Sequence, residues 1–576
     1  MGAPGPTARS RRAGNVVVPA EFPAPVDPVK EFIGPPTDPE DERIEVGVAI
    51  VGGGPAGLAC AIRLMQLVGE DEQLAESLGE VPVAVIEKGK TCGAHNLSGA
   101  ILRPAVMREL LPDSEPGDWP TYGEVTGEAV YVMLNSRRSL RIPTPPPFRN
   151  HGNHVVSVAE LSRWLAGKAE EAGAYILTET SATKLLVDDG VVRGVRSGDK
   201  GRGRDGEELS NFEPGSDVVA RATLLAEGTW GHLTGAAIRH FELGTDDPQE
   251  WALGVKEVWE VERPLDKVVH TLGWPLRTQA RYGEFGGSFI YPMGEDKVSI
   301  GFVVGLNYAD IELSVHDILQ EFKLHPRIRS ILEGGRRLTW GAKAIPEGGY
   351  WAMPKLTAPG MAICGDGGGM VNVSELKGIH YAMDAGMMAA EHIYRALKRG
   401  STDLSGYDGA VRESAIGQDL HRTRNMKQPF TRGFFLGGAI VNAMVATKGR
   451  FPGGHWRTHR DAEAPMFRGG RAGAYPRPDG KYTFDKLSSV FLTGNETRDN
   501  APNHIRIQRQ VPRELAEMWQ WMCPAGVYEV PEDAPEEGPV ELIVNYTNCV
   551  QCGAITAKGG RLVPPEGGDG PLYTVT

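Results

Sequence analysis

The chain has 576 residues, and at about 150 residues per domain it can hold several structural units with sizeable cores. Its 74 acidic and 61 basic side chains give a formal net charge of −13, which argues against a nucleic-acid-binding protein because such proteins present a basic surface. Six cysteines are too few for a disulfide scaffold and suit a reducing compartment, where thiols serve metals or redox chemistry.

Residues 1–43 repeat proline without any apolar periodicity, so we expect a largely disordered tail. The Ser10-Arg11-Arg12 run is similar to the start of a twin-arginine export signal, but no apolar stretch follows it. An organelle transit peptide is the other alternative, and the proline and glycine content disfavours the amphipathic helix that such a peptide forms.

Ordered structure is predicted to begin with residues 46–51, an apolar run typical of a buried parallel strand. The pattern Gly52-x-Gly54-x-x-Gly57 and a helix follow at once. In such a turn Gly52 permits the tight bend, Gly54 lets a pyrophosphate approach the backbone, and Gly57 lets helix and strand pack closely. The next strand, 83–86, ends at Glu87, which would accept hydrogen bonds from a ribose. The alternative is a glycine turn that binds no ligand.

Two later turns favour FAD over NAD. Glu227-Gly228 follows a predicted strand at 222–226, and Gly365-Asp366 follows a strand that ends at Ile363. Flavoproteins with two dinucleotide-binding motifs use such turns to reach the ribityl chain and to close over FAD, whereas a simple NAD domain needs neither. Strands at 287–291 and 297–304 predict a separate antiparallel sheet, and a long helix is predicted through 382–398.

Seven further motifs carry a specific resemblance. They are Gly93–Ala100, Gly286–Phe289, Glu333–Arg337, Met370–Val373, Lys481–Ser489, Cys523–Glu529 and Pro565–Pro571. From about residue 44 to 576 the chain resembles the electron transfer flavoprotein:ubiquinone oxidoreductase family. The resemblance implies an α/β, two-dinucleotide FAD-binding Rossmann-like fold with an α+β quinone-binding unit and a C-terminal ferredoxin-like iron–sulfur unit. It also implies an enzyme that passes electrons from reduced electron transfer flavoprotein, through a [4Fe–4S] cluster and FAD, to ubiquinone or menaquinone.

The same resemblance sets the expected domains and two further sites. Residues 44–240 and 355–420 are expected to form the FAD-binding domain, 241–354 the quinone-binding domain, 421–473 a basic membrane-contact region and 474–576 the iron–sulfur domain. Gly286 and Gly287 would offer backbone groups to the quinone carbonyls, and Asn372 would lie near the flavin. Without the resemblance, the two glycines indicate a bulged strand and Asn372 a turn residue.

Three cysteines crowd near the C-terminus: Cys523, Cys549 and Cys552. Their spacing allows thiolate ligation of one cluster. The last family motif is C-x-x-C-x-x-C, and its third position here is Ile555, which cannot bind iron. Three alternatives follow: a cluster that has three irons or a non-cysteine or solvent fourth ligand, a zinc ion, or no metal. We expect the scattered Cys60, Cys92 and Cys364 to be packing residues.

Residues 421–471 carry ten basic against two acidic side chains, a local net charge of +8. Between Arg432 and Lys448 lie 15 uncharged residues, fewer than the ~20 needed to span a bilayer. We expect this segment to dip into a membrane interface, with an ordinary core helix as the alternative. The protein would then be a monomer, peripheral on the cytoplasmic face of a bacterial inner membrane, or on the mitochondrial inner membrane in a eukaryote.

Two rival functions come from other classes. An FAD-dependent NAD(P)H monooxygenase or prenyl reductase with a degraded iron–sulfur site would leave the C-terminal motifs unexplained. A membrane-bound scaffold without enzymatic activity would bind no flavin. We expect no catalytic acid, base or nucleophile, because the chemistry would belong to the cofactors.

Overall fold

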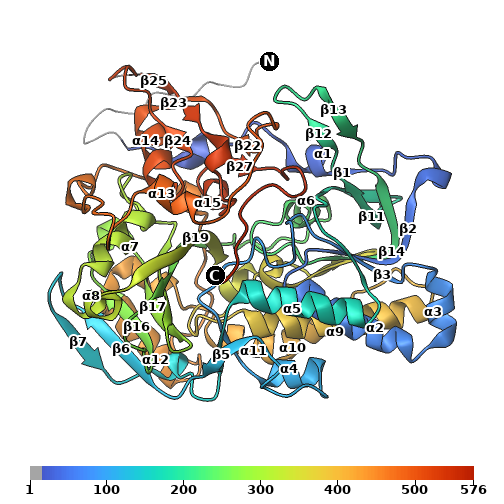
Figure 1. Ribbon diagram of the computed structural model, residues 1–576, viewed down its shortest axis with the longest axis horizontal. Helices are drawn as coiled ribbons and strands as arrows, with labels where there is room; N and C mark the ends of the chain where they lie inside the picture. The colour runs from blue at the N-terminus through green and yellow to red at the C-terminus, as the bar shows by residue number, and fades with distance from the viewer. Residues whose placement is uncertain (1–15, 537) are drawn as a thin grey trace.

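Two large β-sheets and a loop-rich C-terminal unit make up the protein, and the computed structural model describes residues 16–536 and 538–576 (Figure 1). The first sheet is largely parallel around its centre and lies between two layers of helices. The second sheet is mainly antiparallel. The C-terminal unit shares a core with the second sheet, and it lies at the upper left of Figure 1.

The first sheet positions the glycine turn. Its strands are β1 Ile33–Gly34, β2 Ile44–Val51, β3 Val83–Ile86, β9 Tyr175–Leu177, β10 Ala182–Asp188, β11 Val191–Ser197, β14 Asp217–Leu225, β20 Thr357–Ala358 and β21 Met361–Ile363. They run in the order β1-β10-β11-β14-β2-β3-β9, with β21 beside β14 and β20 beside β21. Val48 and Ile50 of β2 belong to one core cluster and Ala49 and Val51 to another. Both faces of β2 are therefore buried, as its continuous apolar run predicts.

Helices cover both faces of this sheet. The face that carries Val48 is covered by α2 Pro55–Gly69, α5 Val158–Glu171, α9 Ile379–Lys398, α10 Gly406–Glu413 and α11 Ala415–Arg422. The opposite face is covered by α1 Pro28–Phe32 and α6 His232–His240. The start of α5 shows how the sequence begins a helix, because Ser157 Oγ accepts a hydrogen bond from the Glu160 N–H at 3.2 Å, as in a capping box.

The second sheet contains β6 Glu128–Met133, β7 Ser139–Ile142, β15 Trp251–Glu260, β16 Val268–Gly273, β17 Gly286–Met293, β18 Lys297–Gly305 and β19 Arg336–Pro346. Its order is β19-β15-β18-β17-β16-β6-β7. The predicted antiparallel pairing of 287–291 with 297–304 is confirmed by β17 and β18. β6 pairs in parallel with β16 and β7 pairs with β6, so strands from the expected FAD-binding segment 44–240 extend this sheet.

The C-terminal unit contains α13 Lys486–Phe491, α14 Arg513–Met522, α15 Ala554–Ala557, β22 Ile505–Arg506, β23 Gln510–Pro512, β24 Tyr528–Glu529, β25 Pro539–Glu541, β26 Ile543–Val544 and β27 Arg561–Leu562. The strands form three short antiparallel pairs, β22–β27, β23–β25 and β24–β26. Trp519 of α14 belongs to the same core cluster as Trp259 and Trp340 of the second sheet. This unit is therefore part of the main body and not an appended module.

The N-terminal residues differ from expectation. Residues 1–15 of the predicted tail lie outside the described residues, but residues 16–43 are not disordered. Val17 pairs with Met466 as an isolated bridge, β1 pairs with β10, and Phe32 is buried with 2% exposure. The disorder prediction fails here because these apolar side chains find partners far along the chain, which local composition does not reveal.

The other elements connect these layers. They are α3 Glu72–Leu78, α4 Ala105–Leu110, α7 Val315–Lys323, α8 Pro326–Leu332, α12 Phe434–Ala446, the sheet β4 Ile101–Leu102, β5 Thr121–Glu124 and β8 His154–Val156, and the hairpin β12 Lys200–Arg202 and β13 Glu208–Glu213. Among the described residues, no helix has both the length and the apolar character needed to cross a bilayer.

Candidate functional site

The glycine turn between β2 and α2 has the shape that its sequence predicts. Gly52 has a φ of +111°, and a Cβ there would lie 2.3 Å from the carbonyl oxygen of Ala226. A Cβ on Gly57 would lie 2.1 Å from the Gly52 carbonyl oxygen, so this glycine lets α2 pack against the turn. Gly54 precedes α2 without a side-chain cap, and Pro55 begins the helix. The unpaired N–H groups of this helix start can therefore receive a phosphate.

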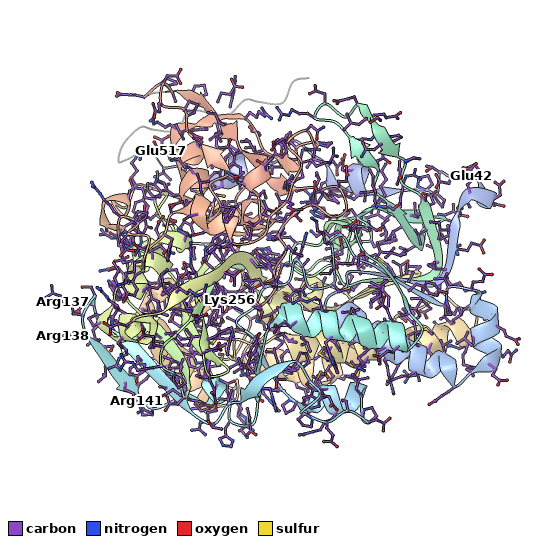
Figure 2. All side chains as sticks on the ribbon, in the orientation of Figure 1. Glu42, Arg137, Arg138, Arg141, Lys256 and Glu517 are labelled. Atoms are coloured by element: carbon purple, nitrogen blue, oxygen red, sulfur yellow. The ribbon has the colours of Figure 1, made fainter. Side chains whose placement is uncertain are left out.

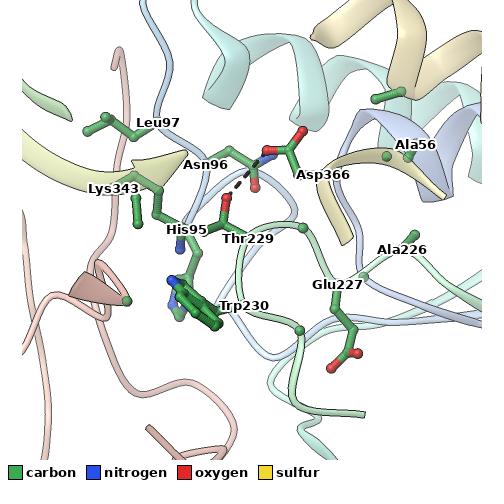
Figure 3. A pocket seen from close by; sticks show the side chains of 18 of the residues that line it. Ala56, His95, Asn96, Leu97, Ala226, Glu227, Thr229, Trp230, Lys343 and Asp366 are labelled. Atoms are coloured by element: carbon green, nitrogen blue, oxygen red, sulfur yellow. Dashed lines mark hydrogen bonds between the residues drawn. The ribbon is translucent and has the colours of Figure 1, made fainter. Parts of the chain in front are cut away.

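A cavity of about 320 Å³ lies beside the turn, and we call it the central cavity (Figure 3). Most of the predicted cofactor residues line it: Gly52, Gly54, Glu87, Glu227, Gly228, Gly365 and Asp366. Residues from the second sheet (Phe289, Lys343) and from the C-terminal unit (His504, Gln551, Gly553) complete its wall. Sequence reasoning missed these five, since each comes from a segment with no nucleotide-binding pattern.

Glu87 and Glu227 are both held by backbone amides. Glu87 accepts hydrogen bonds from the Gly53 N–H at 2.8 Å and the Gly89 N–H at 2.7 Å, which fixes its carboxylate at the end of β3. Glu227 accepts from the Thr234 N–H at 2.6 Å and thereby caps the start of α6. Both line the central cavity, but the Glu227 carboxylate is engaged by the start of α6.

Asp366 and Asn372 were predicted to lie near a flavin, and they have different surroundings. Asp366 lines the central cavity, accepts a hydrogen bond from Thr229 Oγ1 at 3.4 Å, and has its pKa raised by burial. Asn372 is buried in its own loop, where its Oδ1 accepts from Ser374 Oγ at 2.6 Å, and it does not line the cavity. A flavin contact by Asn372 therefore stays a prediction.

Several buried polar atoms on the cavity wall have no partner among the described residues: His95 Nδ1, Trp230 Nε1 and both ring nitrogens of His504. An unpaired buried polar group costs about 1–3 kcal/mol, so these atoms fit a site that a polar ligand completes. Burial, aided by the charges of Lys88 and Arg506, lowers the pKa of His504 to about 4. The ring is therefore neutral near pH 7 and can both donate and accept a hydrogen bond. The donor set fits a dinucleotide such as FAD.

Gly286 and Gly287 begin β17, next to the central cavity. Gly287 pairs with Val303 of β18, and Val303 lines the cavity, although neither glycine does. Cβ atoms at the two positions would lie 1.9 Å from the Val303 carbonyl oxygen and 2.6 Å from the Thr271 carbonyl oxygen, respectively. The ladder runs through both glycines in regular register, so the bulged strand is not observed. The close packing of the sheet alone requires both residues, and a quinone contact stays a prediction.

The three C-terminal cysteines lie in one apolar neighbourhood. Cys523 follows α14 and accepts a hydrogen bond from the Val527 N–H at 3.5 Å. Burial raises the pKa of both other thiols, that of Cys552 to about 12, and the charges of the neighbouring thiols contribute. A bound metal would therefore be needed to hold Cys549 and Cys552 as thiolates near pH 7.

The donor set for a cluster is incomplete. A [4Fe–4S] cluster ordinarily takes four cysteine ligands, and position 555 supplies a buried isoleucine with 4% exposure. Among the described residues, no three His, Cys, Asp or Glu side chains form a group that could hold a metal ion. Cys523, Cys549 and Cys552 share one core cluster and supply three of the four thiolates that a [4Fe–4S] cluster takes, so the fourth ligand is missing.

One short loop separates the thiols from the central cavity. Gln551 and Gly553 line the cavity, and Cys552 stands between them in the chain. Lys88 Nζ donates to Gln551 Oε1 at 2.8 Å, and Lys343 Nζ donates to the Gln551 carbonyl oxygen at 3.3 Å. Burial lowers the pKa of both lysines, that of Lys343 to about 8. Two half-buried lysines from distant segments therefore tie the cysteine loop to the cavity wall.

The basic segment 421–471 is less exposed than its count of charges suggests. Lys427 is buried, with Nζ 3.1 Å from Glu347 and 3.7 Å from Glu250, and Arg471 is buried at 3.4 Å from Glu284. These acids lie outside the segment, so its formal net charge of +8 overstates the charge that it presents on the surface. Exposed cations remain on both sides of α12 at Arg432, Lys448 and Arg450.

Three family models match the chain. One described as "ETF-QO, ubiquinone-binding" matches residues 251–345, one described as "Electron transfer flavoprotein-ubiquinone oxidoreductase, 4Fe-4S" matches residues 480–574, and an FAD binding domain matches residues 108–258. A solved geranylgeranyl bacteriochlorophyll reductase-like protein from Thermoplasma acidophilum is 18% identical and aligns with a TM-score of 0.54 over 70% of this chain and 92% of that chain. These matches confirm the predicted fold class.

Curated relatives match over nearly the whole length. The electron transfer flavoprotein-ubiquinone oxidoreductase of Pseudomonas aeruginosa is 37% identical, over 93% of this chain and 99% of that protein. The mitochondrial proteins of the same name from Arabidopsis thaliana and Caenorhabditis elegans are 38% and 35% identical over 93% of this chain, and the matches cover 85% and 94% of those proteins. With the cavity and the cysteine loop in the arrangement described, the chain belongs to the electron transfer flavoprotein-ubiquinone oxidoreductase family.

Proposed function

We propose that this protein accepts electrons from reduced electron transfer flavoprotein and passes them, via an iron–sulfur cluster and FAD, to a membrane quinone. The observation that carries the proposal is the shared wall, in which Gln551 and Gly553 face the central cavity while Cys549 and Cys552 lie in the same loop. When bound, FAD and the cluster supply the one-electron chemistry that links a flavoprotein donor to a two-electron quinone acceptor.

The chain contributes position and charge. Gly52, Gly54 and the start of α2 receive the pyrophosphate, and Glu87 and Asp366 lie on the wall at two other turns. Lys88 and Lys343 place positive charge between the cavity and the cysteine loop. A half-buried cation favours added negative charge nearby, because the protein screens the charge less than water does. These lysines therefore stabilise the electron-rich forms of both bound groups.

Gly286 and Gly287 are our proposed quinone contact, and their connection to α12 supports it. Phe285 packs on Phe430 with ring centroids 4.6 Å apart. Phe430 in turn packs on α12, since a Cβ on Gly437 would lie 2.8 Å from the Phe430 Cα. One layer of aromatic side chains thus joins the start of β17 to the helix that we expect at the membrane, a short route for an apolar quinone.

Helix α12 is the proposed centre of the membrane contact. Gly437, Val441 and Met444 are its buried residues. Phe435 and Leu436 are 71% and 54% exposed, and Phe451 beyond the helix is 53% exposed. Exposed apolar side chains bordered by cations are typical of an interfacial helix.

The β6–β7 hairpin is a second contact that sequence reasoning missed. It exposes Leu134 and Leu140, and Figure 2 shows Arg137, Arg138 and Arg141 at the outer edge of the molecule. The Trp274 N–H donates to the Met133 carbonyl oxygen, and the nearby Thr278 carbonyl oxygen accepts from the Phe434 N–H at 3.2 Å. The hairpin tip and α12 therefore contact the same loop and can face one membrane surface. The protein would bind there as a peripheral monomer, on the cytoplasmic face of a bacterial inner membrane or on the mitochondrial inner membrane.

The test is stepwise reduction of the purified holoenzyme. Reduced electron transfer flavoprotein should bleach the flavin absorbance, and a short-chain ubiquinone or menaquinone should restore it. NADH and NADPH alone should leave the flavin oxidised. Rapid reduction by NAD(P)H without electron transfer flavoprotein would instead support the monooxygenase or prenyl reductase alternative, and a protein purified without flavin would support the scaffold.

A further inference from the structure

Ile555 occupies the position at which the cysteine spacing calls for a fourth ligand, and the structure accommodates it as a core residue. It is the second residue of α15 and belongs to the apolar cluster that contains Cys523 and Cys549. A Cβ on Gly560 would lie 2.5 Å from Ile555 Cγ1 and 2.7 Å from Ile507 Cγ2. The bare backbone of Gly560 thus leaves room for the isoleucine, and hydrocarbon fills the space around position 555.

No other described cysteine can replace the missing ligand. Cys60, Cys92 and Cys364 are buried in the core cluster of α2 and α9, whereas the C-terminal thiols belong to the core of the second sheet and the C-terminal unit. Within the described residues, no group of His, Cys, Asp and Glu completes a metal site around them. Tyr528 is buried in the same core cluster as Cys523 and Cys549, so its hydroxyl group is the rival ligand.

We propose that the protein binds its cluster through Cys523, Cys549 and Cys552 only, so that the iron nearest position 555 has no protein ligand and is lost on oxidation. The balanced step is [4Fe–4S]²⁺ → [3Fe–4S]⁺ + Fe²⁺ + e⁻, and an added oxidant such as ferricyanide takes the electron. Ile555 is buried in an apolar core cluster and adds no donor atom for iron at this position. The stable oxidised cluster is therefore a three-iron cluster. The inference rests on the proposed function only in that the C-terminal unit binds an iron–sulfur cluster.

The experiment compares iron content and electron paramagnetic resonance before and after oxidation. Protein purified without oxygen is treated with ferricyanide and freed of released iron, and iron, acid-labile sulfide and FAD are measured. Wild-type protein should lose one iron in four, keep its sulfide and FAD, and show the signal of an oxidised three-iron cluster. Fe²⁺ with dithionite should restore the fourth iron.

Two variants at position 555 sharpen the comparison. Ile555→Cys should retain all four irons through the same treatment and show no three-iron signal. Ile555→Val, which changes side-chain volume without adding a ligand, should behave as wild type. Tyr528→Phe should also leave the wild-type iron loss unchanged, because the hydroxyl is not the ligand.

The contrary outcomes are distinct. A wild-type cluster that keeps its fourth iron as firmly as Ile555→Cys overturns the inference, while the reaction with electron transfer flavoprotein and quinone stands. Faster iron loss in Tyr528→Phe than in wild type overturns it in favour of a tyrosine ligand. Protein that contains FAD but no iron or sulfide overturns both the inference and the cluster step of the proposed function.

Discussion

Replacing Phe435 and Leu436 by serine should weaken membrane binding by roughly a hundredfold. The two side chains are 71% and 54% exposed on α12, so most of their surface is free to enter a lipid interface. Full burial of a Phe or Leu side chain contributes about 1.5–3 kcal/mol, and weighting this by the exposed fractions gives about 3 kcal/mol for the pair. At about 1.4 kcal/mol per tenfold change in affinity, the loss is about two orders of magnitude.

The flanking cations should act differently. Arg432, Lys448 and Arg450 are exposed at the two ends of α12, and each contributes about 1 kcal/mol near an anionic surface. The triple glutamine variant should therefore lose affinity only for vesicles that contain an anionic lipid, and the difference from wild type should fade as salt is raised. The serine variant should lose affinity for neutral vesicles too, at any salt concentration.

Flotation of the holoenzyme with phosphatidylcholine vesicles, with and without phosphatidylglycerol, measures both effects. The matched control is Leu487→Ser with Phe491→Ser, because these α13 side chains are 60% and 84% exposed but lie on the C-terminal unit. The control pair should bind vesicles as wild type does. If the α12 serine variant floats like wild type, or if both serine pairs weaken binding equally, α12 is not the membrane contact.

Three further predictions concern the central cavity and its surroundings. Gly57→Ala should be purified with little FAD, because its Cβ would lie 2.1 Å from the Gly52 carbonyl oxygen. The control is Gly69→Ala in the same helix, where a Cβ meets nothing within 4 Å, and this variant should keep a full FAD-to-protein ratio. His504→Ala should weaken FAD binding about tenfold, which is the contribution of one hydrogen bond in a buried site. Fluorescence of the released flavin measures this loss. If the variant retains FAD as well as the wild type does, His504 does not contact FAD. Lys256→Met should remove a pH dependence of the free energy of unfolding, because burial lowers the Lys256 pKa from 10.5 to about 7. Between these two pH values the unfolded chain binds more protons than the folded protein. The stability of the wild type should therefore rise with pH by up to about 1.4 kcal/mol per pH unit relative to the variant. The free energy of unfolding is measured with urea at several pH values between about 7.5 and 9.5. A difference between the two proteins that stays the same across this range would contradict that reasoning.

Local patterns predicted the parts of the fold that local forces determine. The strand, glycine turn and helix around Gly52 follow from an apolar run and three glycines, and the structure shows why the larger side chains are excluded. The antiparallel β17–β18 pair was equally visible as two strand-length apolar runs, and the length of the uncharged segment 433–447 excluded a spanning helix. Most of the predicted cofactor residues therefore line one cavity.

Long-range pairing explains what the sequence left hidden. The charge of segment 421–471 was misjudged because Lys427 pairs with Glu250 and Glu347, acids that no local count includes. The place of residues 128–142 in the second sheet was hidden because β6 pairs with β16, which lies far along the chain. His504 gave no signal, since an isolated histidine becomes informative only when its unpaired nitrogens are seen on a cavity wall.

The shared wall of the central cavity separates two roles of the C-terminal unit. His504, Gln551 and Gly553 close the cavity from this unit, and its core is continuous with the second sheet through Trp519. We therefore expect FAD binding to depend on the folded C-terminal unit, and iron binding to depend on the thiols and on position 555. Loss of one cluster ligand can therefore change the metal content while the FAD site keeps its walls, because the isoleucine preserves the packing that holds the loop against the cavity.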